Sequence, residues 1–146
     1  MRLSELFREV EFDGSIKNDA DINLVTDDSR LVRPGSLFVC IRHRSFDGHT
    51  AALDALASGA AAVVTQDRLG LENELRVADS RSAYARLCAA LCNHPERKLR
   101  MIGVTGTNGK TTVTTLIRNI LSDSGTKTLL TGTVCNLSLI HISEPT

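Results

Sequence analysis

The chain has 146 residues, of which 42% are hydrophobic, and its 17 basic and 17 acidic residues give a formal net charge of zero. This length allows one domain, or a small domain with part of another, and the balanced charge gives no indication of nucleic acid binding. No apolar run approaches the roughly 20 residues that span a bilayer, and residues 1–10 lack the apolar core of a signal peptide. Four cysteines without paired short spacings fit a reducing compartment. We therefore expect a cytoplasmic protein without nucleic acid or membrane partners.

The first hundred or so residues alternate between strand-like and helical segments. A short amphipathic helix is predicted at the start, with its apolar face formed by Leu3, Leu6, Phe7 and Val10. Strands are predicted over residues 22–26, 37–41, 61–65 and 74–78. Further helices are predicted over residues 51–58 and 80–92. Such alternation predicts an α/β protein.

The predicted helix over residues 80–92 carries Cys88 and Cys92 on one face, shortly before His94. Two thiolates and an imidazole could ligate a metal. The same face is the apolar stripe of the helix, however, and cysteine is commonly buried, so core packing is the better interpretation. We expect Leu87, Cys88 and Leu91 to be buried, with no metal near Cys88.

A second domain is predicted to follow a basic, turn-rich stretch, and we place the boundary after residue 97. Residues 101–105 are apolar and β-branched, which predicts a buried strand. Glycines then break the pattern, and from Lys110 apolar residues recur at helical spacing. A strand, a glycine loop and a helix in this order form a phosphate site, because the loop amides and the helix N-terminus direct positive partial charge to one place.

The loop has the pattern Gly106-x-x-Gly109-Lys110-Thr111. In a phosphate loop, Lys110 reaches the β- and γ-phosphates and the Thr111 hydroxyl ligates Mg²⁺. The strict pattern has a glycine at position 104, where this chain has Val104, so the loop is a shortened form. A glycine turn followed by a solvated lysine is the alternative, but the flanking predicted strand and helix favour the phosphate site.

The complete string of residues 103–112, Gly-Val-Thr-Gly-Thr-Asn-Gly-Lys-Thr-Thr, is more specific. It resembles the ATP loop of the Mur ligases, which build the peptide of bacterial cell-wall precursors, and the shortened loop is that family's own form. Within the family it is most similar to the enzymes that add the third residue of the peptide. The resemblance implies Mg²⁺ as cofactor, Lys110 as the catalytic residue and Thr111 as the metal ligand. The ATP-binding residues that it implies are Gly106, Thr107, Asn108, Gly109, Lys110, Thr111 and Thr112.

The resemblance extends to both sides of this loop. The N-terminal domain of the same ligases resembles residues 28–30, 32–39, 47–49 and 59–64, and the segment after their ATP-loop helix resembles residues 131–136. By this resemblance, residues 1–97 form the small domain that binds the UDP-sugar substrate. Residues 98–136 begin the central P-loop domain, with a mainly parallel sheet.

The resemblance places the UDP-sugar on Ser29 and on a second loop at Arg44, Ser45 and Phe46. Hydroxyl and guanidinium groups are suitable phosphate donors. On spacing alone, the Asp28-Ser29 pair could equally cap a turn. Phe46 could stack on uracil or cover the core.

The resemblance also implies a reaction. The complete enzyme would use ATP to phosphorylate the free carboxylate of UDP-N-acetylmuramoyl-L-alanyl-D-glutamate. The amine of a diamino acid, meso-diaminopimelate or L-lysine, would then displace phosphate to form an amide. A piece of the protein that ends near residue 136 would be inactive alone. The alternatives are another Mur-type or folylpolyglutamate-type ligase and a non-enzymatic nucleotide-binding module.

The last segment, residues 137–146, differs from the family's continuation. It resembles the translation of a transposon-based sequencing adapter. We expect it to be non-native, irregular and without a functional residue, including His141. A divergent natural strand is the alternative.

Overall fold

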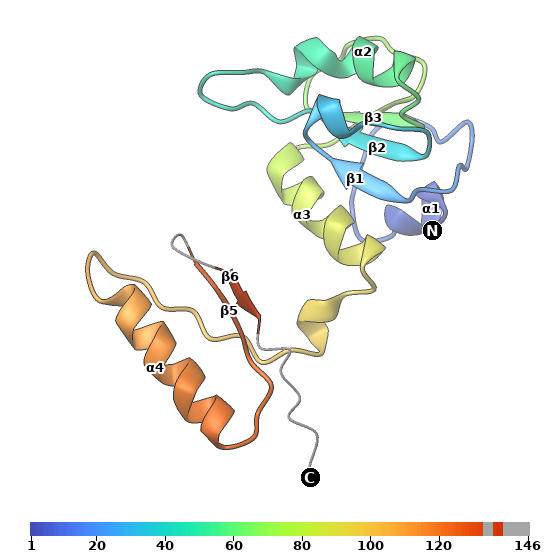
Figure 1. Ribbon diagram of the computed structural model, residues 1–146. Coiled ribbons are helices and arrows are strands. Elements are labelled where there is room, and N and C mark those ends of the chain that lie inside the picture. The colour runs from blue at the N-terminus through green and yellow to red at the C-terminus, as the bar shows by residue number, and fades with distance from the viewer. Residues whose placement is uncertain (133–135, 139–146) are drawn as a thin grey trace. The chain divides into compact units, whose positions relative to one another are not determined.

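The structure is a computed structural model that describes residues 1–132 and 136–138 (Figure 1). It divides into two compact units, Met1–Leu99 and Arg100–Thr146, which we call the first and second units. The division falls close to the boundary expected from the sequence, and each unit is described separately below.

The first unit is built on a four-stranded sheet with the order β1-β2-β3-β4. Its strands are β1 (Leu24–Thr26), β2 (Ser36–Val39), β3 (Ala62–Thr65) and β4 (Glu74–Arg76). Each strand is parallel to the one before it in the sequence. Every residue of β2 and β3 is buried, as expected for parallel strands that are covered on both faces. The α/β class and the positions of these strands are confirmed, although each strand is shorter than predicted.

Helices cover both faces of this sheet (Figure 1). α1 (Leu3–Leu6) and α3 (Ser80–Leu91) pack on one face, and α2 (Ala52–Ala57) packs on the other. Successive strand residues point to opposite faces. Leu37 and Val39 therefore join the core under α1 and α3, whereas Phe38 contributes to the core under α2. Three short 3₁₀ turns complete the unit: η1 (Ser29–Leu31), η2 (Gly48–Ala51) and η3 (Pro95–Arg97).

The helix α3 begins where Asp79 caps its first turn, because the Asp79 carboxylate accepts hydrogen bonds from the backbone N–H groups of Arg81 (2.9 Å) and Ser82 (3.3 Å). Leu87 is fully buried, as predicted. Cys88 and Leu91 were also predicted to be buried, but they are only half-buried at the edge of the core. Cys92 is exposed and lies outside the apolar stripe. Among the described residues, no group of three or more His, Cys, Asp or Glu side chains could hold a metal.

The second unit contains α4 (Lys110–Asp123), β5 (Leu129–Thr131) and β6 (Asn136–Ser138). The predicted helix start at Lys110 is confirmed. The predicted buried strand over residues 101–105 is wrong: the segment is irregular, and Met101 is 76% exposed. A strand needs a hydrogen-bonded neighbour, but among the described residues β5 pairs with β6 in antiparallel fashion and nothing pairs with residues 101–105.

The segment expected to be irregular, residues 137–146, begins within a strand. Leu137 and Ser138 belong to β6 and pair with β5, so the expectation is wrong there. Pairing with β5 uses backbone groups, so it places little demand on which residues follow. The rest of the segment, with His141, lies outside the described residues.

The helix α4 keeps an exposed apolar face. Val113, Leu116 and Ile120 are 44%, 56% and 67% exposed, at the helical spacing seen in the sequence. The amphipathic pattern was therefore sufficient to predict the helix, although the described part of this unit buries none of its residues. None of the described helices is long and apolar enough to cross a membrane.

Candidate functional site

The parallel sheet of the first unit gathers its following loops at one edge, where the strands end. Open α/β sheets bind ligands at this carboxyl edge. Ser29 begins η1, shortly after β1, and residues 44–46 lie in the loop that follows β2. The structure therefore brings the residues predicted to bind the UDP-sugar to the same edge of one sheet.

The turn after β1 is held by Asp28. Its carboxylate accepts a hydrogen bond from the Arg30 backbone N–H (3.0 Å) and three from the Arg30 guanidinium, at 2.6, 2.9 and 3.2 Å. These bonds from Arg30 lower the pKa of Asp28 to about 2. The turn is therefore capped by Asp28 and not by Ser29, and the Asp28 carboxylate also forms an ion pair with the Arg30 guanidinium. Ser29 is half-buried beside them, and its hydroxyl makes no hydrogen bond within the described residues.

The loop after β2 is closed by backbone hydrogen bonds from His43 N–H to the Phe46 carbonyl (2.8 Å) and from Gly48 N–H to the Ile41 carbonyl (3.0 Å). His43 Nε2 also lies 3.4 Å from a carboxylate oxygen of Asp27, which links this loop to the turn after β1. Phe46 is 48% exposed, so the interpretation that it covers the core is wrong.

The neighbours of Phe46 in this loop, Arg44 and Ser45, are exposed. A guanidinium, a hydroxyl and an aromatic ring are thus presented together on a closed loop. Such a set can bind a phosphate and a base.

The base of the same loop is fixed by ion pairs that the sequence did not indicate. Asp47 accepts hydrogen bonds from His49 N–H (3.0 Å), from His49 Nδ1 (2.6 Å) and from Arg42 Nε (3.1 Å). Arg42 also pairs with Asp67, and its carbonyl accepts a hydrogen bond from Arg81 (2.7 Å). The backbone and side-chain bonds from His49 hold the pKa of Asp47 at about 2. The Asp47–His49 contact lies within the Asp-Gly-His string that only the family resemblance marked. The contacts of Arg42 with Asp67 and Arg81 join residues far apart in the sequence, so no local pattern indicates them.

The low pKa of Asp47 predicts a stability change at acid pH. The folded-state pKa of about 2 lies below the unfolded value of about 4, so ionised Asp47 stabilises the fold above about pH 4, and this contribution is lost as the pH falls towards 2. Asp47→Asn should therefore lower the urea midpoint at pH 7, and the difference from the unchanged chain should shrink at pH 2–3. Asp54→Asn, which alters an exposed acid of α2, is the control. An equal deficit at both pH values would contradict the prediction.

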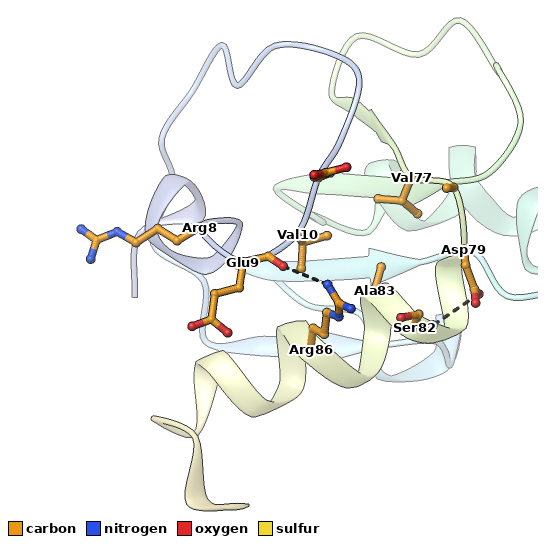
Figure 2. Close-up of a pocket in the computed structure, with 10 residues that line it drawn as sticks. Arg8, Glu9, Val10, Val77, Asp79, Ser82, Ala83 and Arg86 are labelled. Carbon is orange, nitrogen blue, oxygen red and sulfur yellow. Dashed lines mark hydrogen bonds between the residues drawn. The ribbon is translucent and has the colours of Figure 1, made fainter. Parts of the chain in front are cut away.

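A groove of about 390 Å³ lies beside β4, between residues 8–11 and the start of α3 (Figure 2). Its walls carry both charge signs, including Arg8, Glu9, Asp79 and Arg86, and Arg86 donates a hydrogen bond to the Glu9 carbonyl (3.3 Å). None of the residues predicted to bind the UDP-sugar lines it. The predicted site is thus a set of surface loops and is separate from this groove.

The predicted phosphate loop lies in the second unit, where Gly109 forms the N-cap of α4 with φ 77°. A left-handed backbone is readily adopted only by glycine. Gly109 has no side chain to cap the helix, and the first turn carries no acid. The N–H groups of this turn are thus not covered by a side chain of their own helix. A Cβ on Gly109 would meet nothing within 4 Å, so the space above the turn is open.

Lys110 folds back over this loop. Its Nζ donates hydrogen bonds to the carbonyl oxygens of Gly106 and Thr107, the latter at 3.3 Å. Thr107, Asn108, Thr111 and Thr112, in the loop and the first turn of α4, are exposed. The loop therefore combines a lysine ammonium, uncovered amides and hydroxyl groups, which is a donor set suited to a polyphosphate with its metal ion.

Two family profiles match the chain. The profile described as "Mur ligase family, catalytic domain" matches residues 21–95, and the profile "Mur ligase middle domain" matches residues 104–145. The chain belongs to the Mur ligase family. The resemblance seen in the sequence is confirmed. The second match runs into residues 137–146, whose non-native origin stays a prediction that resequencing of the locus would test.

Curated Mur ligases align with nearly all of the chain. The UDP-N-acetylmuramoyl-L-alanyl-D-glutamate–2,6-diaminopimelate ligase of Syntrophomonas wolfei is 41% identical over 140 residues, which covers 92% of this chain and 28% of that protein. The UDP-N-acetylmuramyl-tripeptide synthetase of Deinococcus radiodurans is 39% identical, with coverages of 92% and 29%. The chain thus spans less than a third of the length of these relatives.

Solved Mur ligase structures share the fold. A diaminopimelate ligase superposes with a TM-score of 0.74 and 29% identity, over 97% of this chain and 29% of that one. MurF ligase from Thermotoga maritima, solved with ADP, gives a TM-score of 0.52 and 28% identity, over 68% of this chain and 23% of that one. The α/β fold of a Mur ligase is therefore confirmed for this chain.

Proposed function

We propose that the chain supplies the UDP-sugar-binding unit and the ATP loop of an ATP-dependent amide ligase. The enzyme adds a diamino acid to UDP-N-acetylmuramoyl-L-alanyl-D-glutamate in peptidoglycan precursor synthesis. The observation that carries the proposal is the 41% identity with a diaminopimelate ligase, because it extends over 92% of the chain and so covers both units. The name of that relative favours 2,6-diaminopimelate over L-lysine as the added amino acid.

In the first unit, the carboxyl edge of the sheet receives the uridine nucleotide. The Ser29 hydroxyl and the Arg44 and Ser45 side chains are available to the diphosphate and sugar. Phe46 offers its exposed ring to the face of the uracil base. The His43–Asp27 contact keeps the two loops together, so that one ligand can reach both.

In the second unit, residues 106–112 receive ATP. The uncovered first turn of α4 and the Lys110 ammonium fit the phosphate oxygens, and the exposed Thr111 hydroxyl fits Mg²⁺. Transfer of the γ-phosphoryl group to a carboxylate brings two anions together, so charge neutralisation is the main catalytic demand. The ammonium group of Lys110 supplies part of the positive charge that this neutralisation needs. The amine of the diamino acid then forms the amide, and ADP and phosphate are released. The proposal includes a cytoplasmic location, where ATP is supplied.

The proposal predicts that the 146-residue chain binds UDP and that Phe46→Ala weakens this binding. Loss of an aromatic platform under a base costs about 1–3 kcal/mol, which corresponds to a rise in Kd of roughly 5- to 150-fold. Isothermal titration with UDP measures the effect. Leu53→Ala removes an apolar side chain that is 66% exposed on α2 and should leave the Kd unchanged.

The same titration separates the proposal from the alternatives that do not use a uridine nucleotide. A folylpolyglutamate-type ligase or a simple nucleotide-binding module has no need for uridine. A chain that binds ADP but not UDP would therefore contradict the proposal and favour one of those alternatives.

A further inference from the structure

The imidazole of His49 lies between two elements at the carboxyl edge of the sheet. Its side chain is only 6% exposed. Nδ1 lies 2.6 Å from the carboxylate of Asp47, and Nε2 lies 3.1 Å from the backbone nitrogen of Gln66, which directly follows β3. His49 thus joins the end of the nucleotide loop to the end of the neighbouring strand.

These two contacts determine where the proton of the imidazole lies. A backbone N–H can only donate, so Nε2 must accept the hydrogen bond from Gln66 and cannot carry a proton. The proton is therefore on Nδ1, which donates to Asp47. Only this neutral tautomer satisfies both partners of His49.

The connection continues beyond Gln66. The side-chain amide of Gln66 donates to the Ala78 carbonyl (3.2 Å), and its carbonyl oxygen accepts a hydrogen bond from the Ser80 hydroxyl (2.9 Å). Ser80 is fully buried in the first turn of α3. The loop after β2 is thus tied through His49 and Gln66 to the ends of β3 and β4 and to the start of α3.

We propose that His49 is a positioning residue of the uridine-nucleotide site. As the neutral Nδ1–H tautomer, it holds the loop of residues 42–47 against Gln66 and so sets where Arg44, Ser45 and Phe46 meet the nucleotide. The inference rests on the proposed function and adds to it a residue whose ring contacts are with Asp47 and Gln66.

The two hydrogen bonds of His49 differ in how much their loss should disturb the loop. Asp47 is 38% exposed and has other donors, Arg42 among them, so water can replace the bond from Nδ1. The bond from the Gln66 N–H is part-buried and ends on a ring that is only 6% exposed, and it is the one that joins the loop to the end of β3. Its loss separates these two segments and removes the acceptor of that N–H. The bond to Gln66 is therefore the one that positions the loop.

Two substitutions separate the bonds. His49→Gln places an acceptor near the position of Nε2 and loses the donor at Nδ1. His49→Asn keeps a donor near Nδ1 and cannot reach Gln66. For the 146-residue chain, we expect His49→Asn to raise the Kd for UDP about tenfold, whereas His49→Gln stays within about threefold of the unchanged chain.

His94 provides a matched control. Its Nδ1 lies 2.9 Å from the Glu96 carboxylate, also two residues away in the sequence, but it follows the C-terminus of α3 and so lies far along that helix from the carboxyl edge. His94→Asn should leave the Kd unchanged.

Nitrogen-15 NMR of the imidazoles should show His49 protonated at Nδ1 and not at Nε2. Exchange of the Gln66 amide hydrogen should be faster in His49→Asn than in His49→Gln.

The outcomes are distinct. A His49→Asn chain that binds UDP as tightly as the unchanged chain, or a His49 ring protonated at Nε2, would overturn the inference. If the unchanged chain fails to bind UDP, the proposed function falls instead. The amide exchange of Gln66 and the amide shifts of residues 42–46 then decide the positioning role, since both must change more in His49→Asn than in His49→Gln.

Discussion

Replacing Lys110 by alanine in the complete ligase is expected to lower kcat by about 10²- to 10³-fold, the usual cost of removing one group that stabilises developing charge. The reason lies in the geometry of the loop. The Lys110 ammonium is the cation that the loop itself supplies, held over the carbonyl oxygens of Gly106 and Thr107. Under the proposed function, its interaction with the transferred phosphoryl group is strongest in the transition state, so kcat should fall more than KM for ATP rises.

The measurement is the rate of ADP release at several ATP concentrations. Lys127→Ala removes a second exposed lysine of the same unit, beyond the end of α4, and should leave both kinetic constants unchanged. A Lys110→Ala enzyme with near-normal kcat would show that Lys110 is only a solvated residue at the start of a helix.

Truncation of Leu87 is expected to have the largest effect on stability. The side chain is fully buried between α3 and the sheet, and removal of its outer carbons leaves a cavity where close packing has been lost. Leu87→Ala should therefore lower the free energy of unfolding by about 2–5 kcal/mol. Urea unfolding followed by circular dichroism measures this as a lower midpoint with an unchanged slope.

Leu53→Ala is the matched control, because it makes the same chemical change on α2 at a side chain that is 66% exposed. Its effect should stay within about 0.5 kcal/mol. Equal losses in the two variants would mean that α3 does not pack on the sheet as described.

Local patterns were sufficient to predict the helices and strands of the first unit, because the residues that favour each element lie within it or directly beside it in the sequence. Apolar runs at residues 37–41 and 61–65 became β2 and β3, and Asp79 and the residues after α3 set the ends of that helix. The same reasoning failed at residues 101–105. An apolar run indicates that a segment prefers to be buried, but whether it forms a strand depends on a partner, and the described part of the second unit offers it none.

The candidate site was predictable only in part. Lys110 and the two loop glycines follow a compact motif, so a single string of residues predicted their arrangement at the start of α4. Ser29 and residues 44–46 came from resemblance to a family, and the parallel sheet explains why they meet. The supporting contacts of His49 with Gln66 and of Arg42 with Asp67 join residues far apart in the sequence. Such pairs follow from the tertiary fold alone, and no spacing rule could have indicated them.

The strand order of the first unit bears on how the protein folds during synthesis. Each strand hydrogen-bonds to the strand made just before it, so β2, β3 and β4 each add to an existing edge and none must be inserted between two others. The helix α3 follows β4 in the sequence and covers one face of the completed sheet. The sheet can therefore assemble vectorially, because every strand of its final order is encoded before the residues of the second unit. Destabilising changes in the second unit should accordingly leave the folding of the first unit unaffected.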